Sequence, residues 1–124
     1  MSGLRILVVE DDPFNAELLA ELLGNLGHTV CASVATVANA VTAAEWFAPD
    51  LMIVDERLGD DSGTRAVGLI LKHGHLPHLF ATTSGDRVRT RFPDAVIVSK
   101  PFQGSDLVDG IRMAMTGTGL SVGT

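Results

Sequence analysis

Five short apolar runs alternate along the chain with stretches of helical spacing, and this alternation constrains the fold more than any other feature. The runs cover residues 4–9, 29–33, 51–54, 78–82 and 95–99. Each run is mostly apolar and too short for a typical helix, so we expect each to be a strand buried on both faces. Buried strands that alternate with helices indicate a parallel sheet covered by helices on both sides.

The intervening segments carry the signals of helices. Asp12 is a candidate N-cap, Pro13 suits the first helical position, and Gly27 is expected to end the first helix. Further helices are expected near residues 37–47, 66–74, 86–92 and 103–115, of which 86–92 has the weakest pattern. Five βα units are too few for a closed (β/α)8 barrel, so we predict an open, three-layer α/β fold with parallel strands in the order 2-1-3-4-5.

The length of 124 residues is enough for one domain with one hydrophobic core. We expect a domain over residues 1–116 and a flexible Gly/Ser/Thr-rich tail over residues 117–124. No apolar run is long enough to cross a bilayer and the N-terminus lacks a secretory pattern, so we expect a cytoplasmic protein with no membrane partner. The single cysteine, Cys31, excludes an internal disulfide and a multi-cysteine zinc site.

The acidic residues are concentrated rather than scattered. The formal net charge of −6 argues against a nucleic-acid partner, because such binding depends on a basic surface. Seven of the fifteen acids lie in two short windows that directly follow apolar runs: Glu10, Asp11, Asp12, Asp55, Glu56, Asp60 and Asp61. In an open parallel sheet, the functional crevice lies at the carboxyl ends of the strands, where the strand order reverses. The predicted strand order therefore makes the two windows neighbours.

A cluster of Glu10, Asp11 and Asp55 needs compensating positive charge, because like charges repel at close range. Lys100, at the end of the fifth strand, supplies one charge, and a divalent cation would supply two. An all-oxygen donor set favours Mg²⁺ over Zn²⁺. A carboxylate beside Mg²⁺, with the Lys100 ammonium and the Thr82 hydroxyl converging on it, can attack phosphorus and hold the resulting acyl phosphate. The chemistry of these residues therefore predicts phosphorylation of an aspartate.

Four motifs at four strand ends carry a family resemblance that covers about residues 4–115. They are Ile-Leu-Val-Val-Glu-Asp-Asp-Pro over residues 6–13, residues 51–55 followed by Leu58 and Gly63, Phe80-Ala81-Thr82, and Ser99-Lys100-Pro101-Phe102. In these motifs the sequence resembles the receiver domains of two-component response regulators, and in particular a divergent single-domain subgroup. The resemblance implies a (βα)5 flavodoxin-like fold. It also implies a phosphoacceptor that assists its own phosphorylation and dephosphorylation rather than an enzyme.

The same resemblance implies a role for each site residue. Asp55 would accept the phosphoryl group, Lys100 would bind phosphate, and Thr82 would supply a switch hydroxyl. The Mg²⁺ ligands would be Asp11, Asp55 and the backbone carbonyl of Arg57, with Glu10 acting through water. In the family the peptide bond that follows the lysine is cis, so the bond before Pro101 is expected to be cis.

The resemblance further implies partners. The phosphoryl donor would be a phosphohistidine of a histidine kinase or of a histidine phosphotransfer protein. Phosphorylation is expected to change binding to a downstream protein, through Arg87, Arg91 and the face of the fourth helix, fifth strand and fifth helix. We therefore expect a stand-alone receiver, and two other interpretations stay open. One is a receiver fragment of a larger response regulator or hybrid kinase, and the other is a small hydrolase that forms an aspartyl phosphate.

Three features depart from the common receiver pattern. Ile97 replaces an aromatic residue whose ring moves with the switch threonine in many receivers, so no such ring movement is expected. Gly59 stands where proline is usual, which predicts a freer loop over residues 58–63. Residues 83–92 are weakly patterned, and switching is expected to involve their ordering.

Two groups of polar residues outside the predicted site have simpler interpretations. Three histidines, at positions 73, 75 and 78, straddle a helix end, a loop and a strand start at the opposite end of the predicted sheet from the acids. Solvated loop histidines are favoured there over a metal site. The side chain of Arg57 is open to three interpretations: pairing with Glu56, pairing with Asp60, or leaning over the phosphorylated site.

Overall fold

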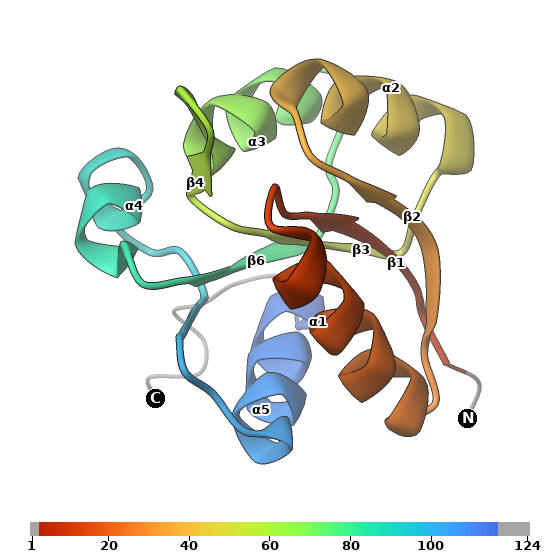
Figure 1. The fold of residues 1–124 in the computed structure, drawn as a ribbon. Coiled ribbons are helices and arrows are strands. Elements are labelled where there is room, and N and C mark those ends of the chain that lie inside the picture. Colours follow the sequence, from red (N-terminus) through yellow and green to blue (C-terminus); the bar gives the residue numbers. More distant parts are fainter. Residues whose placement is uncertain (1–2, 117–124) are drawn as a thin grey trace.

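The computed structural model describes residues 3–116 and has one central five-stranded sheet. Its strands are all parallel and lie in the order β2-β1-β3-β6-β7 (Figure 1). Their bounds are β1 Arg5–Val9, β2 Thr29–Val34, β3 Leu51–Val54, β6 His78–Thr82 and β7 Ile97–Ser99. The predicted order 2-1-3-4-5 is therefore confirmed, because β6 and β7 are the fourth and fifth strands of this sheet.

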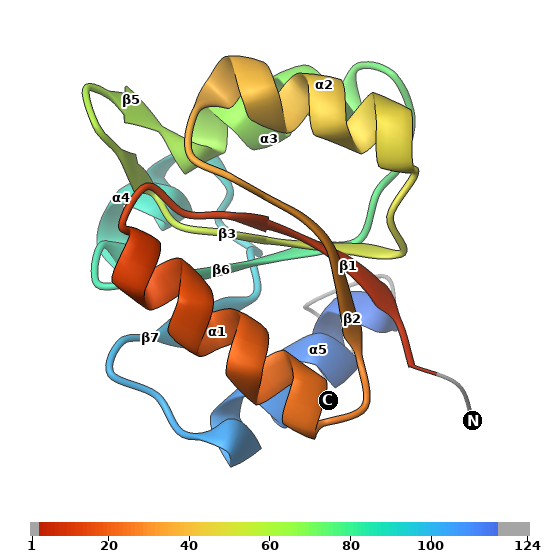
Figure 2. The same ribbon diagram turned by 45° about the vertical axis from the view of Figure 1, so that its right-hand side comes forward.

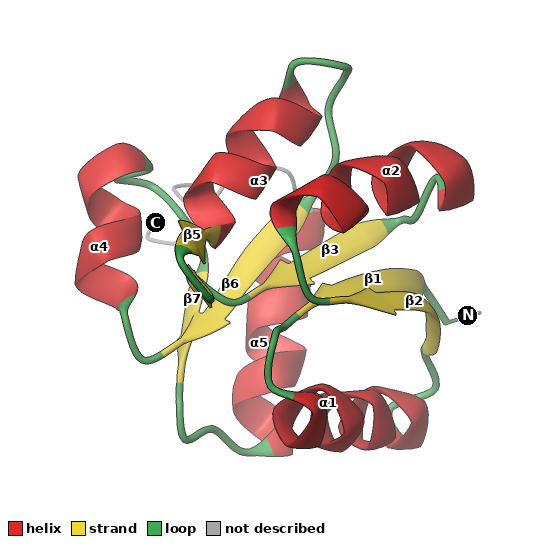
Figure 3. Cartoon of the chain, turned by 45° about the horizontal axis from the view of Figure 1, so that its top comes forward, coloured by secondary structure: helices red, strands yellow, loops and turns green. Residues whose placement is uncertain are grey.

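Five helices cover the two faces of the sheet. They are α1 Pro13–Asn25, α2 Val37–Phe47, α3 Gly63–Leu71, α4 Gly85–Arg91 and α5 Gly104–Met115. Figures 1 and 2 show α1 and α5 on one face and α2 and α3 on the other. Helix α4 contacts β6 and lies toward the β7 edge of the sheet (Figure 3). This arrangement is the predicted three-layer, flavodoxin-like α/β fold.

The sheet separates two hydrophobic clusters, which explains why its strands are apolar on both faces. In β1, Leu7 and Val9 belong to the cluster under α2 and α3, whereas Ile6 and Val8 belong to the cluster under α1 and α5. All four side chains are fully buried. Burial of apolar area is the main favourable contribution to folding, so this alternation favours a position for β1 inside the sheet, with helices covering both of its faces.

The start of α1 follows the local signals in the sequence. The Asp12 carboxylate accepts hydrogen bonds from the backbone N–H groups of Phe14 and Asn15, and Pro13 occupies the first helical turn. Gly27, just beyond the C-cap, has a φ of 92°, a conformation that glycine adopts without steric cost. The predicted ends of this helix are confirmed.

The segment between β3 and α3 differs from the prediction of a polar loop. It forms a short antiparallel hairpin of β4 (Arg57–Leu58) and β5 (Asp61–Ser62). Helix α3 begins at Gly63, earlier than expected, because the Ser62 hydroxyl caps it by accepting a hydrogen bond from the Arg65 N–H. Two-residue strands are too short to produce a recognisable alternation in sequence.

Residues 117–124 lie outside the described residues, and so does the predicted tail. Across residues 3–116, the structure contains no helix that is both long enough and apolar enough to cross a membrane.

Candidate functional site

The two acidic windows meet at the carboxyl end of the sheet. Val9 and Val54 are partners in neighbouring parallel strands, and the Asp55 N–H donates to the Val9 carbonyl at 2.9 Å. The residues that follow these strands are therefore brought side by side. Carboxylate oxygens of Glu10, Asp11 and Asp55 all lie within 4.8 Å of one another. The predicted proximity of these three acids is present in the structure.

Lys100 reaches this cluster from the end of β7. Its Nζ lies 2.7 Å from Glu10 Oε1 and 3.1 Å from Asp55 Oδ2. The backbone N–H of Lys100 donates to the Thr82 carbonyl at 3.1 Å, which ties the lysine to the end of β6. The Lys100–Pro101 peptide bond is cis, as expected. The ammonium thus bridges two acids that are far apart in the sequence.

Burial and charge act on the two partners of this bridge in different ways. Burial raises the pKa of Glu10, and the nearby charge of Asp55 adds to this effect, although hydrogen bonds from Lys100 and Asp12 oppose it. Burial by itself would lower the pKa of Lys100, but its hydrogen bonds to Glu10 and Asp55, together with the negative charges of these two acids, outweigh burial and raise it. The lysine is therefore firmly protonated at neutral pH.

Thr82 ends β6 and is fully buried. Its hydroxyl oxygen accepts a hydrogen bond from the Ser84 N–H at 3.1 Å. Within residues 3–116, the structure contains no hydrogen bond between Thr82 and Asp55. The hydroxyl lies at the same end of the sheet as the acids but is engaged with the start of the β6–α4 connection.

Arg57 contributes its backbone to the site, and its side chain is exposed. The Arg57 N–H donates to Asp55 Oδ1 at 3.3 Å. The two pairings considered for its side chain are not found among the described residues. Glu56 instead accepts hydrogen bonds from the N–H and the hydroxyl of Thr64.

The sequence did not reveal that Glu56 is buried and bonded to the start of α3. It is buried, with only 4% of its surface exposed, and its carboxylate holds the first turn of α3. Its neighbours in the acidic window, Asp60 and Asp61, are exposed. Because all these acids occur in one polar segment, no local pattern distinguishes the buried one.

The donor set of the acidic cluster fits a hard divalent cation. It consists of three carboxylates, and among the described residues no other group of three His, Cys, Asp or Glu side chains is close enough to bind a metal. Mg²⁺ prefers carboxylate oxygens and retains several water molecules, whereas nitrogen and sulfur ligands would favour Zn²⁺. The exposed side of the cluster, at Asp11, leaves room for such water.

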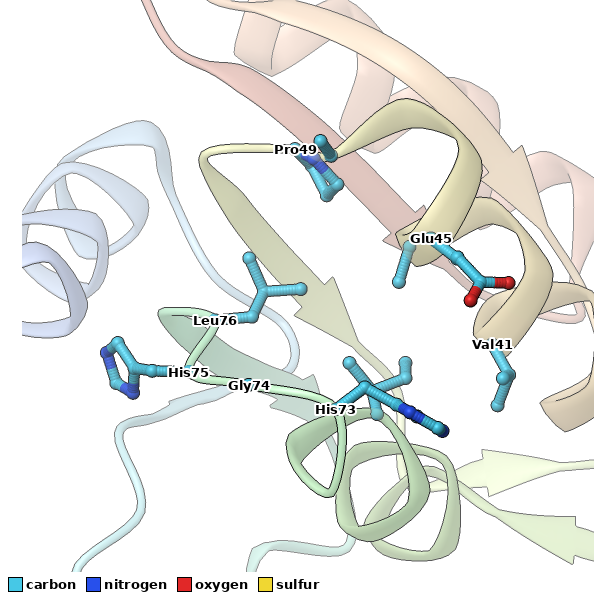
Figure 4. Close-up of a pocket in the computed structure, with 10 residues that line it drawn as sticks. Val41, Glu45, Pro49, His73, Gly74, His75 and Leu76 are labelled. Atoms are coloured by element: carbon cyan, nitrogen blue, oxygen red, sulfur yellow. The ribbon is translucent and has the colours of Figure 1, made fainter.

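The histidines lie far from this cluster. His73 and His75 line a hollow between the ends of α2 and α3, together with Glu45 and apolar side chains. Figure 4 shows the rings of His73 and His75 pointing away from each other, with His73 directed into the hollow. His78 begins β6, so all three lie near the amino end of that strand, opposite the acids. They do not form a metal site.

The fold and the site together define a class: an open, doubly wound α/β domain with an acidic cluster, bridged by a lysine, at the point where the strand order reverses. The sequence matches the family model described as "Response regulator receiver domain" over residues 6–112. The chain therefore belongs to the receiver domain family of response regulators, and the resemblance seen in its motifs is confirmed.

Several characterised proteins are similar to this chain. The phyllosphere-induced regulator PhyR of Methylorubrum extorquens is 36% identical over 115 residues, which cover 90% of this chain and 43% of PhyR. The solution structure of the receiver domain of PhyR from Erythrobacter litoralis has a TM-score of 0.84 and 31% identity, covering 95% of this chain and 94% of that domain. The crystal structure of the anti-anti-sigma factor PhyR from Bartonella quintana has a TM-score of 0.80 and 28% identity, covering 94% of this chain and 48% of that one.

The chain spans about half the length of the curated relatives that it matches. The likeness therefore concerns their receiver domains. Phosphoryl acceptance is general for this family, and an acidic pocket is where its members typically bind Mg²⁺.

Proposed function

We propose that this protein accepts a phosphoryl group on Asp55 from a phosphohistidine of a histidine kinase or histidine phosphotransfer protein. The observation that carries this proposal is the position of Lys100 Nζ, which contacts both Glu10 and Asp55. A fixed ammonium beside a carboxylate can neutralise the oxygens of an arriving phosphoryl group. An oxygen of Asp55 would form a bond to phosphorus as the bond from phosphorus to the donor's imidazole nitrogen breaks.

We further propose Mg²⁺ as the cofactor of this reaction. Asp11, Asp55 and the backbone carbonyl of Arg57 would bind it, and Glu10 would act through water. The engagement of Glu10 with Lys100 and with the Asp12 N–H supports this indirect role, because both of its oxygens already accept hydrogen bonds. The cation, when bound, would supply positive charge to the phosphoryl oxygens.

The remaining proposed roles follow from position. The Thr82 hydroxyl, whose oxygen accepts from the Ser84 N–H, would donate its proton in a hydrogen bond to a phosphoryl oxygen and so act as the switch. Lys100 would keep its contact with the site through the phosphate. The protein would serve as a phosphoacceptor that assists its own phosphorylation and dephosphorylation, and would not turn over a separate substrate.

The output that we propose is altered binding to a partner protein in the cytoplasm. Arg87 and Arg91 are exposed on α4, and we propose them as contacts on the face formed by α4, β7 and α5. The Bartonella relative is named an anti-anti-sigma factor, and this name denotes an action on another protein factor. A protein partner also agrees with the net charge of −6, which does not favour nucleic acid.

The test is phosphorylation with acetyl phosphate, followed by intact-protein mass spectrometry. The wild type should gain the mass of one phosphoryl group only when Mg²⁺ is present, and Asp55→Asn should gain none. Asp12→Asn is the matched control, since it removes a neighbouring charge outside the cluster but keeps an oxygen that can cap α1. It should be modified like the wild type. A wild type that is not modified, or an Asp55→Asn protein that still is, would contradict the proposal.

A further inference from the structure

The β4–β5 hairpin contacts the acidic cluster through a single backbone group. The Gly59 N–H donates a hydrogen bond to Asp11 Oδ2 at 2.8 Å. Gly59 is at the turn of the hairpin, with a φ of 61°, and a Cβ added to it would meet open space. The glycine in place of the usual proline predicted a freer loop here. The structure instead shows the Gly59 N–H bonded to an acid of the site.

The hairpin that presents this N–H is itself anchored at its base. The Gly63 N–H donates to the Glu56 carbonyl at 2.8 Å, which closes the segment on itself. The buried Glu56 carboxylate then binds the N–H of Thr64 at 2.8 Å. These bonds join both ends of the hairpin to the start of α3, so Gly59 is held in place by contacts independent of Asp11.

Asp11 differs from the two other acids of the cluster in its partners. Lys100 forms ion pairs with Glu10 and Asp55, and among the described residues no ion pair involves Asp11. Asp11 is also the exposed member of the cluster. Repulsion by two neighbouring carboxylates would turn an exposed, unrestrained carboxylate toward water. The hydrogen bond from Gly59 opposes this movement and leaves Oδ1 of Asp11 free to bind a cation.

We propose that Gly59 is a positioning residue for the divalent cation: its N–H holds the Asp11 carboxylate in the orientation that binds the metal. The proposal rests on the function proposed above. It also explains why this position suits glycine here. Proline has no N–H and a φ near −65°, so it supplies neither the donor nor the backbone conformation seen at Gly59. Partners that orient a metal ligand typically change metal affinity by about 10- to 100-fold when removed.

The test is Mg²⁺ binding to the full chain, measured by isothermal titration calorimetry in the absence of any phosphoryl donor. We expect Gly59→Pro to raise the Mg²⁺ dissociation constant by about tenfold. Gly59→Asn keeps the N–H, and asparagine tolerates a positive φ, so it should bind Mg²⁺ within about twofold of the wild type. Gly27→Ala is the matched control for replacing a glycine that has a positive φ. Gly27 also has open space around it, but it lies at the end of α1 that is distant from Asp11.

A second measurement tests the hydrogen bond without relying on the proline variant to fold. Hydrogen exchange by NMR should show protection of the Gly59 amide in the wild type and loss of that protection in Asp11→Ala, while the Gly27 amide stays unchanged. Equal Mg²⁺ affinity of Gly59→Pro and wild type, tighter binding by Gly59→Pro, or an unprotected Gly59 amide would each overturn the inference. If the wild type itself fails to bind Mg²⁺ or to become phosphorylated, the proposed function fails instead.

Discussion

Two connections flank the phosphoacceptor candidate, and they are built differently. The β3–α3 connection is held by the Glu56 carboxylate, by the Gly59 N–H and by the close approach of Gly63 to Asp55. The β6–α4 connection is held near the site by one bond, from the Ser84 N–H to the Thr82 hydroxyl. It leads into a seven-residue helix with no side-chain N-cap and one buried residue, Val88.

This difference separates a fixed side of the site from a side that can change. A metal ligand set requires fixed geometry, and the residues that we propose to bind Mg²⁺ lie on the well-anchored side. Segments with few buried contacts open locally at low free-energy cost, and α4 is such a segment. The expectation that switching involves residues 83–92 therefore stays a prediction, with a structural reason behind it.

The largest expected effect comes from glycines at the starts of the two helices. A Cβ at Gly63 would lie only 2.2 Å from the backbone oxygen of Asp55, so Gly63→Ala should lower the free energy of unfolding by about 3 kcal/mol. A Cβ at Gly85 would meet Ile97 at 3.4 Å, an ordinary contact, so Gly85→Ala should change stability by less than about 0.5 kcal/mol. Urea unfolding of both variants measures this, and equal losses would contradict the comparison.

The next effect concerns the acids near the two helix starts. Glu56→Ala should cost about 2 kcal/mol, because it leaves the buried Thr64 N–H without its partner and leaves the Thr64 hydroxyl with only the Ser62 hydroxyl. Asp86→Ala removes an exposed acid from the first turn of α4 and should cost at most about 0.5 kcal/mol. Both variants remove one negative charge, so the pair separates burial from net charge. Urea unfolding at one pH compares them directly.

A smaller effect is expected in the local opening of the two helices. Backbone amides of α4 should exchange with deuterium about tenfold faster than those of α3, which corresponds to about 1.4 kcal/mol in opening free energy. NMR hydrogen exchange on the wild type provides the measurement. Protection of α4 equal to that of α3 would remove the distinction between a fixed and a changeable side.

The smallest effect is a pH dependence carried by His78. Its ring packs edge-on against Phe80 and Phe92, the residue at the end of α4, and burial lowers its pKa. The folded state therefore binds fewer protons at this site than the unfolded state. The contribution of His78 to the free energy of unfolding should be constant above about pH 6.5 and should fall as the pH drops from there toward the lowered pKa.

Urea unfolding at about pH 7.5 and about pH 5 measures this loss. The loss should be smaller in His78→Gln. It should persist in His73→Gln, because His73 is an exposed histidine at the end of α3. An unchanged loss in His78→Gln would show that other groups carry the pH dependence. Lower protection factors of the α4 amides at the lower pH, after correction for the intrinsic pH dependence of exchange, would show that protonation of His78 loosens α4.

Much of the fold was predictable because its signals are local. Asp12 and Pro13 start α1, Gly27 follows its end, and the apolar runs become the five strands of the sheet. Boundaries were less accurate where packing decides them. Strand β7 begins at Ile97 and not at Ala95, because only residues 97–99 pair with β6.

The site was partly predictable for the same reason. Acids at the carboxyl ends of strands in a known order must be neighbours, and the structure brings Glu10, Asp11 and Asp55 together with Lys100. The burial of Glu56 and the bond from Gly59 to Asp11 were not predictable. They depend on a two-residue hairpin and on distances across the chain, which leave no periodic pattern in the sequence.

The sequence by itself determined which residues meet at this site, because hydrophobic periodicity sets the strands and the topology of parallel sheets sets their neighbours. Only the tertiary structure decided how those residues are held. It gave Glu10 and Asp55 the shared ammonium of Lys100 and gave Asp11 a backbone N–H from the hairpin. The physical reason is that hydrogen bonds depend on distances of a fraction of an ångström, which follow from packing and not from the order of residue types.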